Sequence, residues 1–308
     1  MRHVKRMLIV SHILLAALVA IVLFMPDTRK VYPPTALLVA VAIMEGLFLL
    51  ALWRSKNRIR EGLPVGCVDI ISFTWLLLIL WEVTSTKLGI AHNVLIPSPE
   101  NVFHVFVRSG SELAFGVYSS LTLLLSGYIL GMFFGAALGI ICGWIPRLRV
   151  MFYPIANVLA PIPSVIFTPF LVILMPTYRM AAIMVILLGV FWPQFLNMIL
   201  RVGSLPKAII DNARVLKVGY LTMITKVIFP FIVPDLLKGM RVSLTTGFLM
   251  LMYAESFGTK SGIGYFISNA NVFANYANIL AGIIVCGIVV TILNYATAWL
   301  QKKLTTWH

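Results

Sequence analysis

Charged residues are scarce in this chain of 308 residues: Asp, Glu, Lys and Arg make up 11% of it, whereas 60% of the residues are hydrophobic. A soluble domain carries roughly 25% charged residues. The chain therefore lacks the polar surface of a soluble, disordered or fibrous protein, and its composition predicts an integral membrane protein.

Cysteine and histidine are also few, with three and five copies scattered along the chain. They form no CxxC pair and no HExxH motif, and the sequence contains no P-loop, nucleophile elbow or EF-hand loop. We therefore expect no disulfide framework, metal site, catalytic residue or bound cofactor in this chain.

Eight apolar segments are long enough to cross a bilayer, which needs about 20 apolar residues per helix. The predicted spans are residues 7–25, 35–53, 68–90, 117–144, 151–175, 180–200, 238–257 and 278–300. The first resembles a signal peptide, but its apolar stretch is long and Phe24–Asp27 is not a small-residue cleavage site. We interpret it as a retained anchor.

The positions of the positive charges predict the orientation. If the N-terminus is cytoplasmic, 18 of the 24 Lys and Arg residues fall in cytoplasmic segments. Positive charge concentrates on that side of membrane proteins. An even number of spans with both termini cytoplasmic follows, and the net charge of +14 needs no nucleic-acid partner to explain it.

The fourth span carries glycines at regular spacing: Gly127, Gly131, Gly135, Gly139 and Gly143. Residues four apart share one helix face, and small residues let another helix approach closely in lipid. The spacing favours tight helix packing over a direct role in a substrate path.

The fifth span is rich in proline, with Pro154, Pro161, Pro163, Pro169 and Pro176. Proline removes a backbone donor and disrupts the preceding turn, so this segment is predicted to be broken or kinked. Such breaks line binding sites in some transporters. A cavity-lining segment and a merely kinked packing helix remain equal alternatives.

Three glutamates lie inside predicted spans: Glu45, Glu82 and Glu255. Ionisable residues at membrane depth are functional candidates. For Glu82 and Glu255, which lie near span ends, the alternative is that they reach interfacial water and need no particular partner.

A long polar insertion, residues 201–241, separates the sixth and seventh spans. Ser204 can cap a helix that has Pro206 in its first turn. An amphipathic helix of three to four turns is predicted over 207–219. Its expected apolar face is Ile209, Ala213, Leu216 and Tyr220, opposite Lys207, Asp211 and Arg214.

A second short helix should follow, ended by Pro230 and Pro234. Two such helices at the cytoplasmic surface lie on lipid headgroups or dock in a partner's groove. Composition alone does not choose between these possibilities.

This insertion resembles the EAA motif of ABC importer permeases. Asp211-Asn212-Ala213 stands at the first triplet, and Val227 with Phe229-Pro230 falls at the required distance without a gap. The departure is Lys217, which occupies the usual glycine position, with Gly219 two residues later. The register is kept, whereas the turn between the two helices is left open.

Other stretches are similar to the nitrate, sulfonate, taurine and bicarbonate branch of these permeases. They are Trp81-Glu82, Ile96-Pro97-Ser98-Pro99, Phe191-Trp192-Pro193, Ala254-Glu255 and Gly262-Ile263-Gly264-Tyr265. The resemblance covers about residues 70–303.

The resemblance implies an all-α integral membrane protein of about eight transmembrane helices. Residues 1–66 would be an extra pair of helices with a basic link, and residues 67–308 a six-helix permease core with a coupling loop at about 204–235. It implies an inner-membrane subunit that pairs with a second permease chain as a homodimer. Two cytoplasmic ATPase subunits, which bind ATP and Mg, and an extracytoplasmic substrate-binding protein would complete an importer for a small solute.

The resemblance also implies functional residues. Those expected to couple to the ATPase are Asp211, Asn212, Ala213, Arg214, Lys217, Gly219 and Pro230. Polarity within the spans nominates a solute path: Pro161, Pro163, Trp192, Gln194, Asn197, Ser243, Thr246 and Glu255, with Thr245 beside them. The alternative for the hydroxyls is a bond to their own helix carbonyls.

Three other functions compete with this one. An integral-membrane enzyme would need a constellation of His, Asp or Glu at one membrane face, and the scattered histidines argue against it. A secondary transporter would need paired charges near the midplane and, often, inverted repeats, neither of which is seen. A non-transporting membrane scaffold would keep the fold without the activity, and only an assay separates it from a permease.

Overall fold

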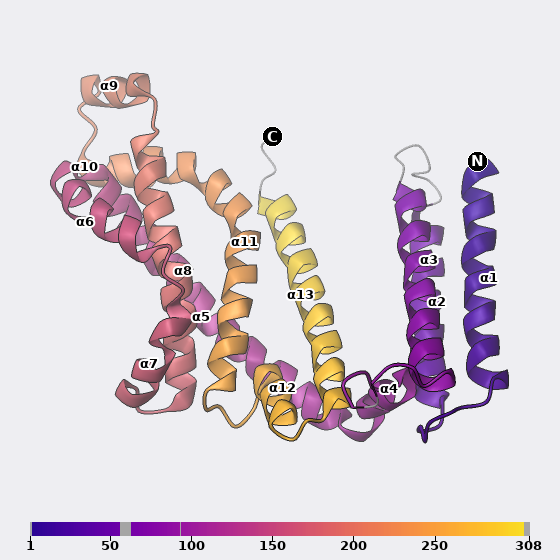
Figure 1. Cartoon of the computed structure of the whole chain (residues 1–308). Coiled ribbons are helices and arrows are strands. Elements are labelled where there is room, and N and C mark those ends of the chain that lie inside the picture. The colour runs from indigo at the N-terminus through magenta and orange to yellow at the C-terminus, as the bar shows by residue number, and fades with distance from the viewer. Residues whose placement is uncertain (1, 56–62, 93, 305–308) are drawn as a thin grey trace. The chain divides into compact units, whose positions relative to one another are not determined.

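The computed structural model describes residues 2–55, 63–92 and 94–304, and every regular element in these ranges is a helix (Figure 1). Within these ranges, 7 helices are long and apolar enough to cross a membrane, and a bent helix pair makes 8 if it forms one span. The predicted all-α membrane fold of about eight spans is confirmed.

The chain divides into two compact units by its internal contacts. The first comprises the chain up to Glu112 together with Ala270–Ala281, and the second comprises Leu113–Asn269 and the chain from Gly282 onward. The boundary expected after residue 66 rested on the span count of the resembling family, and it stays a prediction.

The first unit contains α1 (Arg2–Phe24), α2 (Thr35–Ser55), α3 (Leu63–Glu82), the π-helical turn η2 (Val83–Lys87) and α4 (Pro99–Arg108). α3 packs against both α1 and α2. Their shared core consists of Leu18, Val22, Leu37, Val41, Phe48, Val68, Ile71 and Trp75. The two N-terminal helices therefore pack on the third one.

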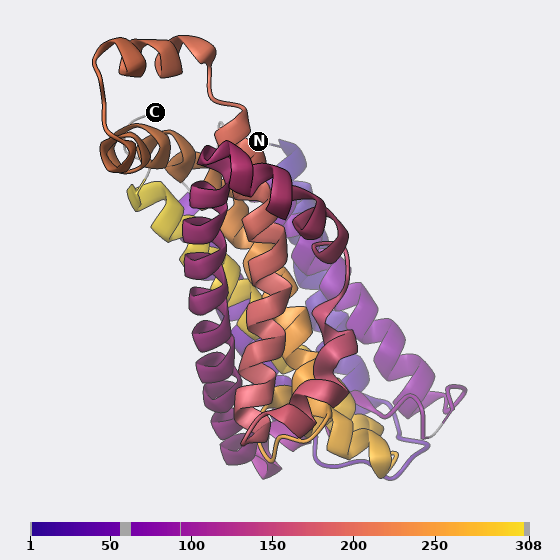
Figure 2. The same cartoon turned by 90° about the vertical axis from the view of Figure 1, so that its left-hand side faces the viewer.

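The second unit begins within the long helix α5 (Gly110–Trp144), which is followed by α6 (Pro146–Leu159). The next elements are η3 (Ser164–Phe167), α7 (Thr168–Leu174), α8 (Tyr178–Gly203), α9 (Lys207–Val215), α10 (Tyr220–Thr222), the π-helical η4 (Met223–Ile228), α11 (Phe229–Ser256), α12 (Ile263–Val272) and α13 (Tyr276–Leu304). The end of α12 and the start of α13 fall in Ala270–Ala281 and thus in the first unit. α11 packs along α8. In Figures 1 and 2, α9 lies beyond one end of these helices, and the turn between α7 and α8 lies at the other.

The glycine face of α5 packs directly on α8. A Cβ atom built on Gly127 would come within 2.8 Å of the Ile183 carbonyl oxygen, and one on Gly139 within 2.7 Å of the Phe195 carbonyl oxygen. A Cβ on the other three glycines of this face would also come too close to α8. Those on Gly131, Gly135 and Gly143 would meet Val190, Gln194 and Val202, respectively. The predicted tight packing is confirmed, and its partner is α8.

The proline-rich segment is broken rather than merely curved. α6 and the helical stretch Ser164–Leu174 meet at an angle of 85°. Pro161 and Pro163 lie in the break, and Pro163 is the residue that precedes η3. The predicted disruption of the fifth span is therefore confirmed. Its physical cause is that these prolines leave the backbone without the donors that a continuous helix needs.

Candidate functional site

The first candidate site is the α9 segment, and its start differs from the prediction. Ser204 ends α8: its backbone N–H donates to the Leu200 carbonyl at 3.1 Å, and its hydroxyl donates to the Arg201 carbonyl at 2.8 Å. The prediction that Ser204 caps the following helix is wrong. The carbonyl of Pro206 instead accepts from the Ile209 N–H at 3.0 Å as α9 begins.

The end of α9 shows why glycine is usual at the position that Lys217 occupies in this chain. α9 ends at Val215, so the predicted helix over 207–219 was too long. The Val218 N–H donates to the Ala213 carbonyl at 3.0 Å, and Lys217 has φ 52°. This is the bond of a Schellman motif, whose left-handed residue is usually glycine. Gly219, with φ −68°, takes no part in that turn.

Lys217→Gly is expected to stabilise this helix end. A residue with a side chain costs roughly 1–2 kcal/mol in the left-handed region, and glycine removes that cost. We expect slower chymotryptic cleavage at Tyr220 in the purified variant. Lys217→Ala is the matched control, since it removes the ammonium group but keeps Cβ. Equal protection by both substitutions would contradict the assignment of strain to the backbone.

The side chains of the α9 segment do not form the predicted apolar face. Ala213 is buried, but Leu216 and Tyr220 are 75% and 78% exposed. Val215 and Leu221 are likewise 82% and 76% exposed, and we call these four exposed apolar side chains the α9 patch. The prediction was wrong because the backbone reverses at Lys217, so helical spacing does not continue to Tyr220.

The other residues expected to couple to an ATPase lie around this patch. Asp211, Asn212, Lys217 and Gly219 are exposed. Ala213 contacts the chain's own core, which includes Met198 of α8 and Ile228 and Ile232. The side chain of Arg214 lies outside the described part of the chain.

Pro230 and Pro234 do not end a helix, contrary to the prediction. The helical elements run without a gap from Tyr220 to Ser256; Pro230 lies in the first turn of α11, and Pro234 lies within that helix. A proline within a continuous run of helix leaves a carbonyl of the preceding turn without its N–H donor, so irregular helical bonding is expected just before it. The wider π-helical turn of η4, whose last bond joins the Phe229 N–H to the Ile224 carbonyl, precedes Pro230 directly.

The second candidate site surrounds Glu255, whose side chain is fully buried. Its carboxylate accepts from the Ser120 hydroxyl at 2.7 Å and from the Gly264 N–H at 2.8 Å. The Ser120 hydroxyl in turn accepts from the Ile263 N–H at 2.8 Å. Glu255 thus joins α5, α11 and the start of α12, and the alternative that it reaches interfacial water without a particular partner is wrong.

Gly262 makes this arrangement possible. Its φ is 128°, and a Cβ there would come within 2.5 Å of the Glu255 carboxylate. Two stretches that carried the family resemblance, Ala254-Glu255 and Gly262-Ile263-Gly264-Tyr265, are therefore one structural unit. We call Ser120, Glu255 and the 262–264 backbone the Glu255 clamp.

The third candidate site lies in the first unit around Glu82, which is also fully buried. The Lys87 ammonium lies 3.5 Å from Glu82 and 2.6 Å from Asp27. The Thr86 hydroxyl lies 3.3 Å from Glu82 and 3.1 Å from Glu100. The alternative that Glu82 reaches interfacial water without a particular partner is therefore wrong.

This cluster has the oxygen ligands of a cation site, with carboxylates of Asp27, Glu82 and Glu100 within 4.8 Å of one another. The Lys87 ammonium already supplies a cation, and it also donates to carbonyl oxygens of Val22 and Met25. The cluster therefore ties the end of α1 to η2. Glu45, the third glutamate within a span, lies 3.3 Å from Nε2 of His12 on α1.

The residues nominated for a solute path differ in their exposure and in their hydrogen bonds. Thr246 and Thr245 donate to the carbonyls of Val242 and Arg241, at 3.1 and 3.0 Å, which is the alternative considered for these hydroxyls. Gln194 is buried, and its amide nitrogen has no partner among the described residues. Pro161 and Pro163 are exposed, whereas Trp192, Asn197 and Ser243 are half-buried.

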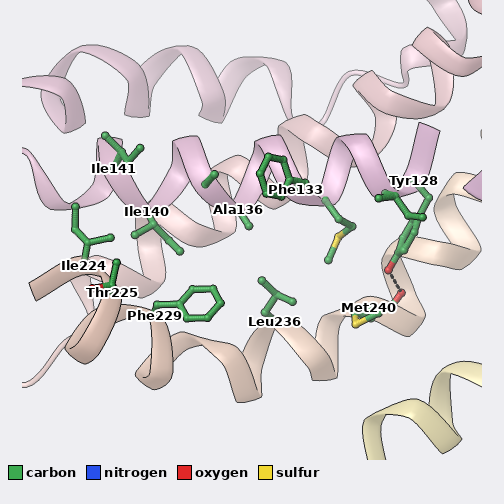
Figure 3. Close-up of a pocket in the computed structure, with 13 residues that line it drawn as sticks. Tyr128, Phe133, Ala136, Ile140, Ile141, Ile224, Thr225, Phe229, Leu236 and Met240 are labelled. Carbon is green, nitrogen blue, oxygen red and sulfur yellow. Dashed lines mark hydrogen bonds between the residues drawn. The ribbon is translucent and has the colours of Figure 1, made fainter. Parts of the chain in front are cut away.

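A groove of about 720 Å³ lies between α5 and the η4–α11 segment (Figure 3). Its walls are apolar, with Phe133 and Ile140 facing Phe229 and Leu236 in Figure 3. The Tyr128 hydroxyl at one end donates to the Met240 carbonyl at 3.0 Å, so it offers its proton to the chain itself. None of the nominated path residues lines this groove, and its chemistry does not suit a polar solute.

A known protein family and several individual proteins are similar to most of this chain. The family described as "Binding-protein-dependent transport system inner membrane component" matches residues 114–306. The putative aliphatic sulfonates transport permease SsuC of Bacillus subtilis (strain 168) is 29% identical over 232 residues, which are 74% of this chain and 83% of that protein. The taurine transport system permease TauC of Escherichia coli (strain K12) is 27% identical over 263 residues, 83% of this chain and 93% of that protein.

A solved structure has the same fold in its permease chain. A chain of the MetNI methionine ABC transporter, in an inward-facing conformation, superposes with a TM-score of 0.58 at 18% identity. The match covers 64% of this chain and 98% of the other chain. The region that matches the family begins at residue 114, next to the start of the second compact unit at Leu113.

Proposed function

The chain belongs to the family of binding-protein-dependent transport system inner membrane components, and from this premise we propose how it works within an ABC importer. It is a multi-pass permease subunit of the inner membrane, and its family works with an ATPase and a binding protein. In our proposal two copies form the solute path, both termini are cytoplasmic, and ATP with Mg²⁺ is bound by the ATPase partners.

The proposed solute is a small anion or zwitterion. The similar proteins are named for aliphatic sulfonates, taurine, nitrate and bicarbonate. In this proposal selectivity rests mainly with the binding protein, which is supported by the scatter of the nominated path residues along the spans. Gln194, with its buried amide nitrogen unpartnered among the described residues, is the path residue we favour most.

The observation that carries the coupling proposal is the α9 patch. Its four apolar side chains are exposed, and Asp211 and Lys217 of the same segment are exposed as well. Helix α9 itself lies beyond the ends of α8 and α11 (Figure 2). Exposed apolar patches rimmed by polar groups mark protein interaction sites. We propose that Val215, Leu216, Tyr220 and Leu221 enter a groove of the ATPase, with Asp211, Asn212 and Lys217 at the rim.

The opposite side of the α9 segment connects this contact to the spans. Ala213 packs in one core cluster with Met198 of α8 and with Ile228 and Ile232, which lie at the start of α11. A packed cluster transmits displacement because it is not compressible. Movement of α9 with the ATPase would thus shift α8 and α11 together. The path would then open alternately to the outside and to the inside of the membrane.

Purification of the tagged chain from its native membrane in mild detergent tests this proposal. We expect an ATPase subunit to co-purify in equimolar amount. Leu216→Glu is expected to reduce its recovery by about tenfold or more, because it places a charge in an apolar contact. Phe273→Glu is the matched control, since Phe273 is 74% exposed but lies outside the α9 segment. An unchanged complex with Leu216→Glu would overturn the proposed contact.

A further inference from the structure

A pocket of about 610 Å³ lies where the ends of α5 and α8 meet the start of α6. Trp144 is the last residue of α5, and Gly203 is the last residue of α8. Both helices are membrane-span candidates, so the pocket opens where the spans end. Ile210 of α9 forms part of its wall.

The functional groups in this pocket are hydrogen-bond donors. The side chains that line it include the Arg149 guanidinium, the Tyr153 hydroxyl and the Trp144 indole, and none of the described residues that line it carries a carboxylate. The indole N–H of Trp144 is enclosed, and no acceptor for it exists among the described residues. A buried donor without an acceptor in its own chain indicates an acceptor from elsewhere.

Arg149 is available for such an acceptor. In the described part of the chain, the neighbouring Arg201 pairs with Asp235 at 3.2 Å, whereas Arg149 forms no ion pair. The Arg149 guanidinium lies over Gly203, because a Cβ there would come within 2.9 Å of its Nη1 atom. Because Gly203 has no side chain, the space beside its backbone is available to this charged group.

The walls beside the donors are apolar. Val150 and Leu200 line the pocket together with Val202 and Ile210. A ligand that fits must carry an anionic oxygen group next to a hydrocarbon part, and it must reach the pocket at the level where the spans end. Arginine is suited to phosphate because its planar donors match the phosphate oxygens. Tryptophan and tyrosine favour the same membrane boundary.

We propose that this pocket binds the phosphate group of an anionic membrane phospholipid, with Arg149 as its main ligand. Oxygen atoms of the lipid headgroup accept from the guanidinium, the Tyr153 hydroxyl and the Trp144 indole N–H, and the first part of an acyl chain lies along Val150 and Leu200. A lipid bound there also contacts Ile210, so it steadies α9 against the ends of α5 and α8. The binding itself does not rest on the proposed transport function.

Native mass spectrometry of the purified full chain, released from nanodiscs of phosphatidylcholine and phosphatidylglycerol, tests this inference. We expect retained phosphatidylglycerol on the unmodified chain. Arg149→Gln should lower that retention about tenfold, since a charge-assisted bond to phosphate is lost. Arg147→Gln is the matched control: it lies two residues away on α6, is exposed, and does not line the pocket. It should keep the lipid.

Gly203→Ala separates local geometry from net charge. It leaves every charge in place but puts a Cβ where the guanidinium lies. The flexible end of Arg149 can move aside, so we expect a smaller loss of lipid retention than with Arg149→Gln. Size-exclusion chromatography of each variant checks that it is folded. An intact chain with Arg149→Gln that retains the lipid fully would overturn the inference.

Three further outcomes would also overturn it. Equal loss with Arg147→Gln and Arg149→Gln would indicate a diffuse surface charge. Competition by millimolar inorganic phosphate as effective as by phosphatidylglycerol would indicate a site for a free anion. Protection of Arg149 only in the presence of the ATPase would indicate that an acidic protein segment, and not a lipid, fills the pocket.

Discussion

Replacing Gly139 by leucine is expected to prevent α5 from packing on α8 and to remove most of the folded protein from the membrane. Even a Cβ at this position would lie 2.7 Å from both the Cβ atom of Met198 and the carbonyl oxygen of Phe195. Backbone atoms cannot rotate away as a flexible side chain can. Overpacking costs typically 1–3 kcal/mol where neighbours adjust, and we expect more than about 3 kcal/mol here.

Membrane abundance and the thermal transition of a fluorescent fusion, followed by size-exclusion chromatography, measure this effect. Gly287→Leu in α13 is the matched control, because a Cβ at Gly287 would meet no atom within 4 Å. Gly139→Ala should fall between the two variants. Similar losses for Gly139→Leu and Gly287→Leu would show that leucine in an apolar helix is harmful in itself, and the close contact with α8 would not be the cause.

The features that sequence predicted well are local or periodic. Glycines four residues apart must share a helix face, so Gly127 to Gly143 indicated a packing surface without any knowledge of its partner. Prolines at 161 and 163 likewise predicted a break, since the missing donors lie in the chain itself. Neither pattern contains the identity of α8 or the angle of 85°, because both depend on distant segments.

The errors arose where tertiary contacts decide the outcome. Because Glu82 and Glu255 lie near the ends of predicted spans, interfacial water was the simplest alternative partner for both. Glu255 instead binds Ser120, which lies 135 residues away, and Glu82 shares a cluster with Glu100 and Lys87. The helix that follows Glu82 contains a π-helical turn, which the sequence did not indicate.

Lys217 was predicted in part from the sequence. The resemblance to ABC permeases marked the position as unusual, and its φ of 52° shows the physical reason why glycine is common there. Helical spacing alone then failed at Leu216 and Tyr220, because the backbone reverses between them. The exposed α9 patch, on which the coupling proposal rests, could therefore not be predicted from periodicity.

Replacing Glu255 by leucine should destabilise the second unit through the loss of the Glu255 clamp. The substitution leaves the Ser120 hydroxyl and the Gly264 N–H without their acceptor in a buried place. A buried group left unsatisfied costs about 1–3 kcal/mol, so we expect a loss of about 3 kcal/mol or more for the two together. Glu255→Gln keeps one acceptor oxygen and should be less harmful.

Ser261→Ala provides the control, because Ser261 lies in the same loop and its hydroxyl is 2.8 Å from that of Ser119, which is outside the clamp. We expect a change of less than about 1 kcal/mol for it. Glu255 was also nominated for the solute path, and the two roles predict different results. A Glu255→Leu protein that melts like the unmodified chain but no longer transports would assign Glu255 to the path. Loss of the folded protein, shared in part by Ser120→Ala, would assign it to the clamp, because Ser120 holds both the carboxylate and the Ile263 N–H.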